Sequence, residues 1–194
     1  MNAVTQSARE QKRALRARCL AARTALSTDE KARLDAALCR AITAHAAFSA
    51  ADLLLLFSPV RGEPDLTSLA QFAAARGIPV AFPRTEGSDM TFRIARPDEL
   101  RERDRFGIPV PSSDAPLALP TRRTLCLLPG LAAGKDGTRL GYGGGFYDRF
   151  LATFAGITLF PIYDFLVFPT LPAEDFDFRV AGLITEKGEC ATDV

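Results

Sequence analysis

Residues that commonly bind metals are scarce in this sequence. It has one histidine, His45, and four cysteines that are scattered without a CxxC pair or any metal-ligand spacing. This excludes most zinc sites, which need clustered cysteine and histidine ligands. We expect the cysteines to be reduced thiols, with Cys126 a small core residue because it lies in an apolar run. His45 falls on the apolar face of a predicted helix, so we expect a structural role for it.

The sequence also lacks a long hydrophobic segment and an excess of charge of one sign. No apolar run approaches the roughly 20 residues of a membrane span, and residues 1–10 are too polar for a signal peptide. The 24 lysines and arginines nearly balance the 23 aspartates and glutamates, which leaves a net charge of +1. We therefore expect a cytoplasmic protein with no membrane or nucleic-acid partner. Arginine outnumbers lysine, however, and suits bidentate binding of phosphate or carboxylate, so small anionic ligands stay open.

Hydrophobic periodicity predicts two N-terminal helices followed by alternating strands and helices. Residues 8–26 favour a helix, and a capping box at residues 27–30 begins a second helix that runs to about residue 47. Beyond these we expect strands at 52–57, 78–82, 90–95, 124–128, 157–162 and 180–185, helices at 66–76 and 145–154, a helical turn at 97–100, and a loop at 83–89. This alternation predicts an α/β fold with a mostly parallel sheet. The length of 194 residues suits a single domain spanning residues 1–194.

Three loops follow predicted strands and are the places where we expect a ligand. In parallel sheets, ligands bind at the carboxyl ends of the strands. The loops that leave those ends are residues 58–63, 83–86 and 129–148. Functional residues are therefore expected in these segments.

The glycine-rich loop, residues 137–145, lies between a predicted strand and a predicted helix. Its glycines let backbone N–H groups approach an anion, and Arg139 is placed to close on a phosphate. It is not a P-loop, because no Lys-Ser or Lys-Thr follows the glycines, and Phe146 stands where a dinucleotide fingerprint needs its third glycine. The loop predicts a nucleotide-phosphate site, and the alternative is a flexible glycine loop packed against the aromatic pair that follows.

Residues 139–149, Arg-Leu-Gly-Tyr-Gly-Gly-Gly-Phe-Tyr-Asp-Arg, resemble the signature of the 5-formyltetrahydrofolate cyclo-ligase family. Three other segments agree with that family in the same order along the chain. Residues 12–16 resemble its Lys-x-x-Leu-Arg helix, residues 57–63 its strand-end loop with a final glutamate, and residues 106–111 its Gly-Ile-x-x-Pro loop. The resemblance extends from about Lys12 to Glu186.

The resemblance implies a compact three-layer, Rossmann-like fold with helices on both faces of the sheet. It implies an ATP- and Mg2+-dependent enzyme whose substrate is a reduced folate, and we expect the enzyme to act as a monomer. The reaction it implies is cyclisation of 5-formyltetrahydrofolate to 5,10-methenyltetrahydrofolate with release of ADP and phosphate. In that mechanism the formyl oxygen attacks the γ-phosphorus and forms an imidophosphate. N10 then attacks the activated carbon, and phosphate departs.

The resemblance also assigns roles to individual residues. Lys12 and Arg139 are expected to stabilise charge during catalysis, Ser58 and Glu63 to contact the folate, and Asp148 either to hold Mg2+ or to cap a helix. The residues expected to bind ATP are Lys12, Arg13, Ala14, Leu15, Arg16, Arg139, Leu140, Gly141, Tyr142, Gly143, Gly144, Gly145, Phe146 and Tyr147.

Less specific interpretations of the same residues stay open. Lys12 and Arg16 share a helix face that is otherwise a solvated basic face, and residues 58–63 are otherwise a simple turn. Four apolar residues are candidates for a pterin slot, although core packing is the simpler explanation for any one of them: Phe82, Met90, Phe92 and Phe106.

Two positions depart from the family pattern. Gly134 stands where an aspartate is common, and Phe176 stands where a histidine precedes Asp177. These departures motivate two alternatives. One is a catalytically idle relative that binds folate or nucleotide, and the other is an ATP-dependent ligase or kinase acting on another small substrate.

Overall fold

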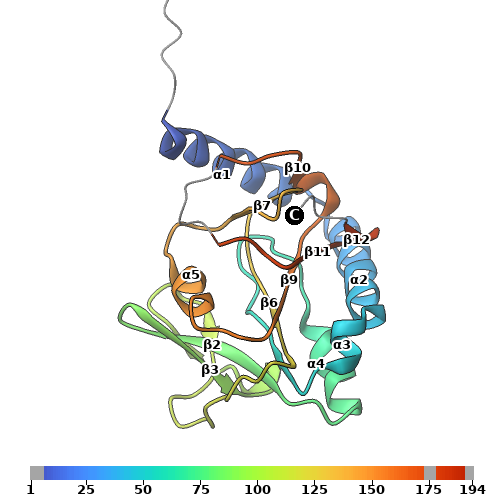
Figure 1. The fold of residues 1–194 in the computed structure, drawn as a ribbon, viewed down its shortest axis with the longest axis vertical. Helices are drawn as coiled ribbons and strands as arrows, with labels where there is room; N and C mark the ends of the chain where they lie inside the picture. The colour runs from blue at the N-terminus through green and yellow to red at the C-terminus, as the bar shows by residue number, and fades with distance from the viewer. Residues whose placement is uncertain (1–6, 173–177, 191–194) are drawn as a thin grey trace, which may run out of the picture.

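The computed structural model describes residues 7–172 and 178–190. A mostly parallel sheet organises them, with the strand order β12-β11-β9-β6-β1-β2-β3 (Figure 1). The pairs that join β11, β9, β6, β1 and β2 are parallel, and the edge strands β12 and β3 are antiparallel to their neighbours. The strands are β1 Leu53–Leu55, β2 Val80–Glu86, β3 Asp89–Ile94, β6 Thr124–Leu127, β9 Ile157–Pro161, β11 Gly182–Thr185 and β12 Gly188–Cys190.

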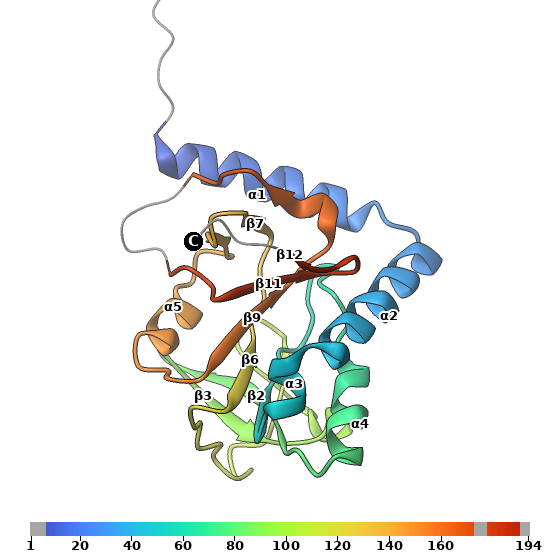
Figure 2. The ribbon, with the colours of Figure 1, turned by 45° about the vertical axis from the view of Figure 1, so that its right-hand side comes forward.

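Helices cover both faces of this sheet (Figure 2). On one face, Leu54 and Leu56 belong to a core cluster with residues from α2, α3 and α4. On the other face, Leu53 and Leu55 belong to a second cluster with residues from α1 and α5. Alternate residues of β1 thus face opposite layers, as in a strand buried on both sides. The helices are α1 Ala8–Thr24, α2 Thr28–Ala44, α3 Ala46–Ala50, α4 Thr67–Ala75 and α5 Phe146–Leu151. The predicted three-layer α/β architecture is confirmed.

Several shorter elements lie outside the central sheet. β7 pairs with β8 and β10, and β4 pairs with β5 in a small hairpin. Their bounds are β4 Glu102–Arg103, β5 Pro109–Val110, β7 Ala132–Gly134, β8 Arg139–Leu140 and β10 Val167–Phe168, with 3-10 turns η1 Pro97–Glu99 and η2 Asp164–Leu166. The sequence pattern predicted the η1 turn but none of these two- and three-residue strands.

Several predicted elements have different bounds in the structure, and two of these differences have a clear local cause. The second helix ends at Ala44, because His45 adopts an extended conformation and its Nδ1 accepts a hydrogen bond from the Ala47 N–H at 3.1 Å. His45 therefore has the expected structural role, as a cap between α2 and α3. Residues 83–89, predicted as a loop, form the β2–β3 hairpin instead, which turns at Gly87 with a φ of 61°.

The remaining expectations about composition can be placed on this fold. Cys126 is fully buried in β6, and the four cysteines are free thiols. Within residues 7–172 and 178–190, no helix has the length and apolar character that a membrane crossing requires.

Truncating Leu54 to Ala in the centre of the sheet should lower the free energy of unfolding by about 2–5 kcal/mol, because Leu54 is fully buried and the neighbouring elements cannot close the cavity. Urea unfolding followed by circular dichroism measures this change. Leu119→Ala is the control, since Leu119 is 77% exposed and its truncation should change the free energy by less than about 0.5 kcal/mol. Equal losses in both variants would contradict this description of the core.

Candidate active site

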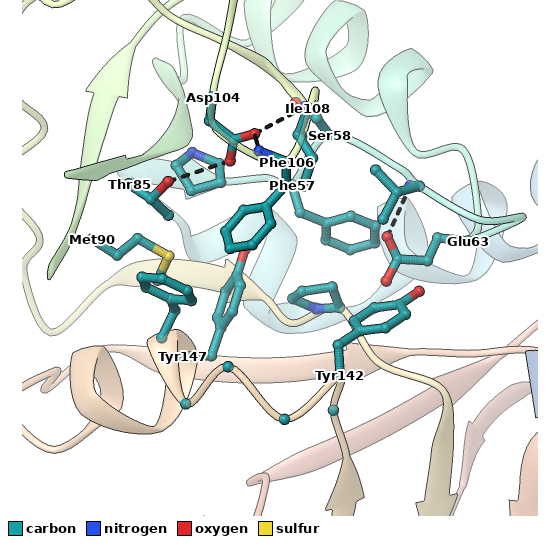
Figure 3. A pocket seen from close by; sticks show the side chains of 18 of the residues that line it. Phe57, Ser58, Glu63, Thr85, Met90, Asp104, Phe106, Ile108, Tyr142 and Tyr147 are labelled. Carbon is teal, nitrogen blue, oxygen red and sulfur yellow. Dashed lines mark hydrogen bonds between the residues drawn. The ribbon is translucent and has the colours of Figure 1, made fainter. Parts of the chain in front are cut away.

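A cavity of about 480 Å³ opens at the carboxyl ends of β1, β2 and β6 (Figure 3). Residues following β1 (57–63), residues at the end of β2 and Pro129 after β6 line it, together with the glycine-rich loop and the β4–β5 hairpin. This volume lies within the range of small-molecule sites. The three segments in which the sequence predicted functional residues therefore meet at one cavity, although residues 83–86 reach it as a strand.

Glu63 places a buried carboxyl group in this cavity. It is 2% exposed, its Oε2 accepts a hydrogen bond from the Val60 N–H at 3.0 Å, and its Oε1 has no partner among the described residues. Burial raises the pKa of Glu63 from 4.5 to about 7, against smaller lowering effects of the Val60 N–H, Arg23, Tyr142 and Arg139. A buried carboxylate with an unused oxygen is suited to a ligand that donates N–H groups.

The turn that carries Glu63, residues 58–63, has a fixed local conformation. Arg61 and Gly62 both have positive φ, at 49° and 74°, and the Glu63 N–H donates to the Val60 carbonyl at 2.9 Å. The Ser58 hydroxyl donates to the Pro109 carbonyl at 2.7 Å, which joins this turn to the β4–β5 hairpin. Residues 58–63 are thus a turn, as the simpler interpretation held, and this turn also lines the cavity.

The glycine-rich loop approaches the cavity from the other side. Gly143 and Gly145 have φ values of 94° and 67°, which side chains rarely allow. A Cβ on Gly141 would lie 2.9 Å from Nη1 of Arg139. α5 after the loop has only six residues, fewer than the predicted 145–154, so the N–H groups of the glycine turn, rather than a long helix dipole, are the available anion donors.

Arg139 lies at the start of β8, within the glycine-rich loop, with its side chain 5% exposed. Its Nη1 donates to the Pro129 carbonyl at 3.0 Å and its Nη2 to Oδ1 of Asp148 at 2.7 Å. The guanidinium carbon is 5.9 Å from the centre of the Tyr147 ring. Arg139, Pro129 and Asp148 all line the cavity. The guanidinium group of Arg139 is therefore a cation held in place at this end of the site.

The two loop tyrosines also line the cavity, on opposite sides in Figure 3. The Tyr147 hydroxyl is buried without a hydrogen-bond partner among the described residues, and burial raises the pKa of Tyr147 well above its ordinary value. The Tyr142 ring is 5.6 Å from the Arg61 guanidinium carbon. Its hydroxyl accepts a hydrogen bond from Arg23.

Other residues expected to bind ATP lie at different depths. Lys12 is 7% exposed, which overturns the solvated-face interpretation for that residue, and Nε of Arg16 donates to the Gly141 carbonyl at 2.9 Å. Neither of them borders the cavity itself. Leu15 packs against the hydrophobic core, whereas Arg13 and Ala14 are exposed.

Two further residues expected to bind ATP, Leu140 and Phe146, also lie at different depths. Leu140 is 2% exposed and belongs to the core cluster, whereas Phe146 lines the cavity. The Phe146 ring is 6.2 Å from the Phe106 ring in an edge-to-face arrangement at the cavity mouth. Gly144 also lines the cavity.

The four candidates for a pterin slot divide into two pairs. Met90 and Phe106 line the cavity. Phe82 and Phe92 are each 2% exposed and pack in the two core clusters. Sequence reasoning missed Asp104, which lines the cavity and accepts a hydrogen bond from the Thr85 hydroxyl at 3.3 Å. Thr85 lies in the predicted segment 83–86, but nothing in the local sequence marks Asp104, since β2 and the β4–β5 hairpin meet only in the folded chain.

Asp148, proposed to bind Mg2+, forms an ion pair with Arg139 and is about half exposed. No group of three acidic, histidine or cysteine residues in the described part of the chain is arranged to hold a metal ion. Mg2+ in nucleotide sites typically needs only one or two carboxylates, with phosphates and water completing its shell. The donor set therefore fits a nucleotide-borne Mg2+ and does not form a protein-only cage.

The departure at Gly134 has a structural counterpart. A Cβ at this position would lie within 3 Å of Oδ1 of Asp136 and of Oγ1 of Thr138, so Asp136 fills the space that an aspartate at 134 would occupy. Asp136 also forms an ion pair with Arg179 at 3.2 Å. The other departure, at Phe176 and Asp177, falls outside the described residues.

Comparisons with known proteins identify the family of the chain. Residues 8–186 match the model of the 5-formyltetrahydrofolate cyclo-ligase family. The chain belongs to this family. A 5-formyltetrahydrofolate cyclo-ligase of Haemophilus influenzae is 33% identical over 104 residues, a match that covers 52% of this chain and only 55% of that protein.

Solved structures show the same family fold. The solution structure of a 5,10-methenyltetrahydrofolate synthetase from Aquifex aeolicus has a TM-score of 0.81 at 29% identity, covering 94% of each chain. A 5,10-methenyltetrahydrofolate synthetase from Mycoplasma pneumoniae has a TM-score of 0.74 at 23% identity, covering 90% of this chain and 98% of that one. The second likeness supports the fold alone.

The raised pKa of Glu63 predicts a pH dependence of stability. The unfolded chain loses this proton near pH 4.5 while the folded protein keeps it up to about pH 7, so Glu63 should lower the free energy of unfolding by on the order of 3 kcal/mol as pH rises from about 4.5 to 7. Glu63→Gln keeps an acceptor for the Val60 N–H and removes the titration. Urea unfolding at pH 5 and pH 8 should therefore show a smaller loss in the variant. The same loss in both proteins would contradict the buried, protonated Glu63.

Proposed function

We propose that this protein catalyses the ATP-dependent cyclisation of 5-formyltetrahydrofolate to 5,10-methenyltetrahydrofolate. The observation that supports it is one cavity with a buried carboxyl group, Glu63, on one side and a fixed cation, Arg139, beside a glycine-rich loop on the other. The first suits a pterin edge and the second suits a polyphosphate. Family membership connects the two ligands to one reaction.

The folate is proposed to bind with its pterin N–H groups toward Glu63. Only the ionised carboxylate accepts hydrogen bonds with both oxygens, and Oε1 is the oxygen that lacks a partner in the described structure. Ser58, 8% exposed and on the same turn, is the second substrate contact. Met90 and Phe106 supply apolar surface for the ring system.

The nucleotide is proposed to bind with its phosphates on the glycine-rich loop. Phosphoryl transfer is accelerated mainly by fixed positive charge and by positioning. Arg139 supplies the charge from within the cavity, and the N–H groups of residues 143–145 supply donors. Lys12 and Arg16 lie one helical turn apart on α1, and Arg16 contacts the loop through Gly141. Mg2+, held by the phosphates with Asp148 as its protein ligand, would neutralise charge on the transferring group.

The proposed chemistry has two steps. The formyl oxygen attacks the γ-phosphorus and releases ADP, which gives an imidophosphate. N10 then attacks the activated carbon and closes the five-membered ring, its proton is lost to solvent, and inorganic phosphate leaves. The protein's contribution is to hold the formyl group against the phosphate. We further propose that residues 1–194 act as one domain, as a monomer in the cytoplasm.

Incubating the purified protein with 5-formyltetrahydrofolate and Mg-ATP should produce the near-ultraviolet absorbance of the methenyl product, in step with release of ADP. Omitting Mg2+ or ATP should abolish both signals. Absence of product when calorimetry shows both ligands bound would contradict the proposal and favour an idle binding protein. Phosphate release with a different acid or amide, but not with this folate, would favour another ATP-dependent ligase or kinase.

Arg139→Ala should lower kcat/KM, because it removes a preorganised charged donor from the phosphate site. The loss should correspond to on the order of 2–4 kcal/mol of transition-state stabilisation. Steady-state kinetics with both substrates measures the loss. Arg122→Ala is a suitable control, since Arg122 is exposed, precedes β6 at its amino end and does not line the cavity. A kcat/KM for Arg139→Ala equal to that of the control would remove Arg139 from the mechanism.

A further inference from the structure

Arg23 is a buried arginine whose role the sequence does not reveal. It lies in the last turn of α1, is 1% exposed, and does not line the cavity. Each of its three guanidinium nitrogens donates to a different segment. Nε donates to the Arg61 carbonyl at 3.0 Å, Nη1 to the Gly130 carbonyl at 2.8 Å, and Nη2 to the Tyr142 hydroxyl.

The three acceptors belong to three walls of the cavity. Arg61 is in the Glu63 turn, Gly130 directly follows Pro129 at the end of β6, and Tyr142 is in the glycine-rich loop. The turn also packs closely on the arginine stem, since a Cβ on Gly62 would lie 3.3 Å from Cγ of Arg23. One side chain on α1 therefore joins segments that are far apart in sequence.

All three acceptors of this buried cation are uncharged. Burial of an arginine is costly unless its donors are satisfied and its charge is compensated. Among the described residues, no carboxylate lies within ion-pair distance of Arg23, and its charge instead lowers the pKa of Glu63. The charge therefore acts on Glu63 in the cavity without pairing with a carboxylate.

We infer that Arg23 is a positioning residue for the folate site: it holds the Glu63 turn and the Tyr142 ring in the places where they receive the pterin. This inference rests on the proposed function for the identity of the ligand. The Tyr142 ring is fixed from two directions, by Arg23 at its hydroxyl and by Arg61 over its face at 5.6 Å. Because Tyr142 accepts from Arg23, its own hydroxyl hydrogen is available for a different acceptor.

Electrostatics gives this role a distinctive signature. The groups that face the Glu63 carboxyl are the Val60 N–H, Arg23 from α1, and Tyr142 and Arg139 from the glycine-rich loop and β8, and all of them oppose the effect of burial on its pKa. Without the Arg23 charge, the pKa of Glu63 should rise above about 7. A larger share of the protein would then have a protonated Glu63 at neutral pH, which accepts fewer hydrogen bonds from a pterin.

Two substitutions separate the effect of the hydrogen bonds of Arg23 from the effect of its positive charge. Arg23→Met removes both, and Arg23→Lys keeps the charge but can reach fewer of the three acceptors. We expect Arg23→Met to raise KM for 5-formyltetrahydrofolate by about tenfold or more while kcat and KM for ATP change much less. The acidic limb of its kcat/KM profile for the folate should move to higher pH. Arg23→Lys should raise the KM but leave the limb nearer to that of the wild type.

Arg18→Met is the matched control. Arg18 lies on the same helix, is exposed, and contacts the Phe168 ring at 5.2 Å rather than the cavity. It should leave both the KM and the pH profile unchanged. If Arg23→Met and Arg23→Lys, confirmed as folded by thermal melting, behave like Arg18→Met, the inference is overturned.

A readout that needs no activity keeps the inference separate from the proposed function. In protein labelled with 13C at glutamate carboxyl groups, the Glu63 resonance, assigned by its absence in Glu63→Gln, should titrate at a higher pH in Arg23→Met than in the wild type. An inactive wild type with this shift present would contradict the proposed function alone. An active wild type with neither the shift nor the KM effect would contradict Arg23 alone.

If Arg23→Met does not fold, Arg23→Lys and Tyr142→Phe provide the test. Tyr142→Phe removes only the hydroxyl that Arg23 binds. Its effect on the folate KM should be smaller than that of Arg23→Lys, and the double variant should be less impaired than the product of the two single effects predicts. Strictly multiplicative effects, or a wild-type KM in Arg23→Lys, would overturn the inference.

Discussion

The parallel alignment of β1, β2 and β6 is the constraint on which the site depends. Parallel neighbours must end at the same edge of the sheet, so the segments that follow Leu55, the end of β2 and Leu127 meet there whatever their sequences. The apolar faces that hold the strands together are buried between two helical layers. Stability of the core and geometry of the cavity therefore have one origin, and the loops supply only the chemistry.

Buried charge then determines what this edge can bind. Glu63, Arg23 and Arg139 are all nearly excluded from solvent, yet no close salt bridge joins any two of them among the described residues. Each is held instead by backbone carbonyls, an N–H group, a tyrosine or an exposed aspartate. Groups arranged in this way keep part of their interaction capacity for a ligand. The separation of a carboxyl side from a cationic side suits a molecule with N–H donors and a second molecule rich in phosphate.

The sequence predicts the central strands well because β1, β6 and β9 are short apolar runs buried on both faces. It does not predict the full length of β2, because that strand extends beyond β1 to pair with β3 alone, where Pro83 and polar neighbours are tolerated. The glycine-rich loop and Glu63 are visible in the motifs. Arg23 is not, since its position on α1 shows neither its burial nor which three segments close over it. The conformation of residues 58–63 likewise follows from contacts that only the folded chain creates.

A crystal structure with 5-formyltetrahydrofolate, Mg2+ and a non-hydrolysable ATP analogue tests the central claim most directly. The account predicts the terminal phosphate against Arg139 and the N–H groups of residues 143–145, and the pterin N–H groups donating to Glu63. The formyl oxygen should lie between the two, within reach of the γ-phosphorus. Phosphates bound away from the glycine-rich loop, or a folate whose pterin does not contact Glu63, would contradict it.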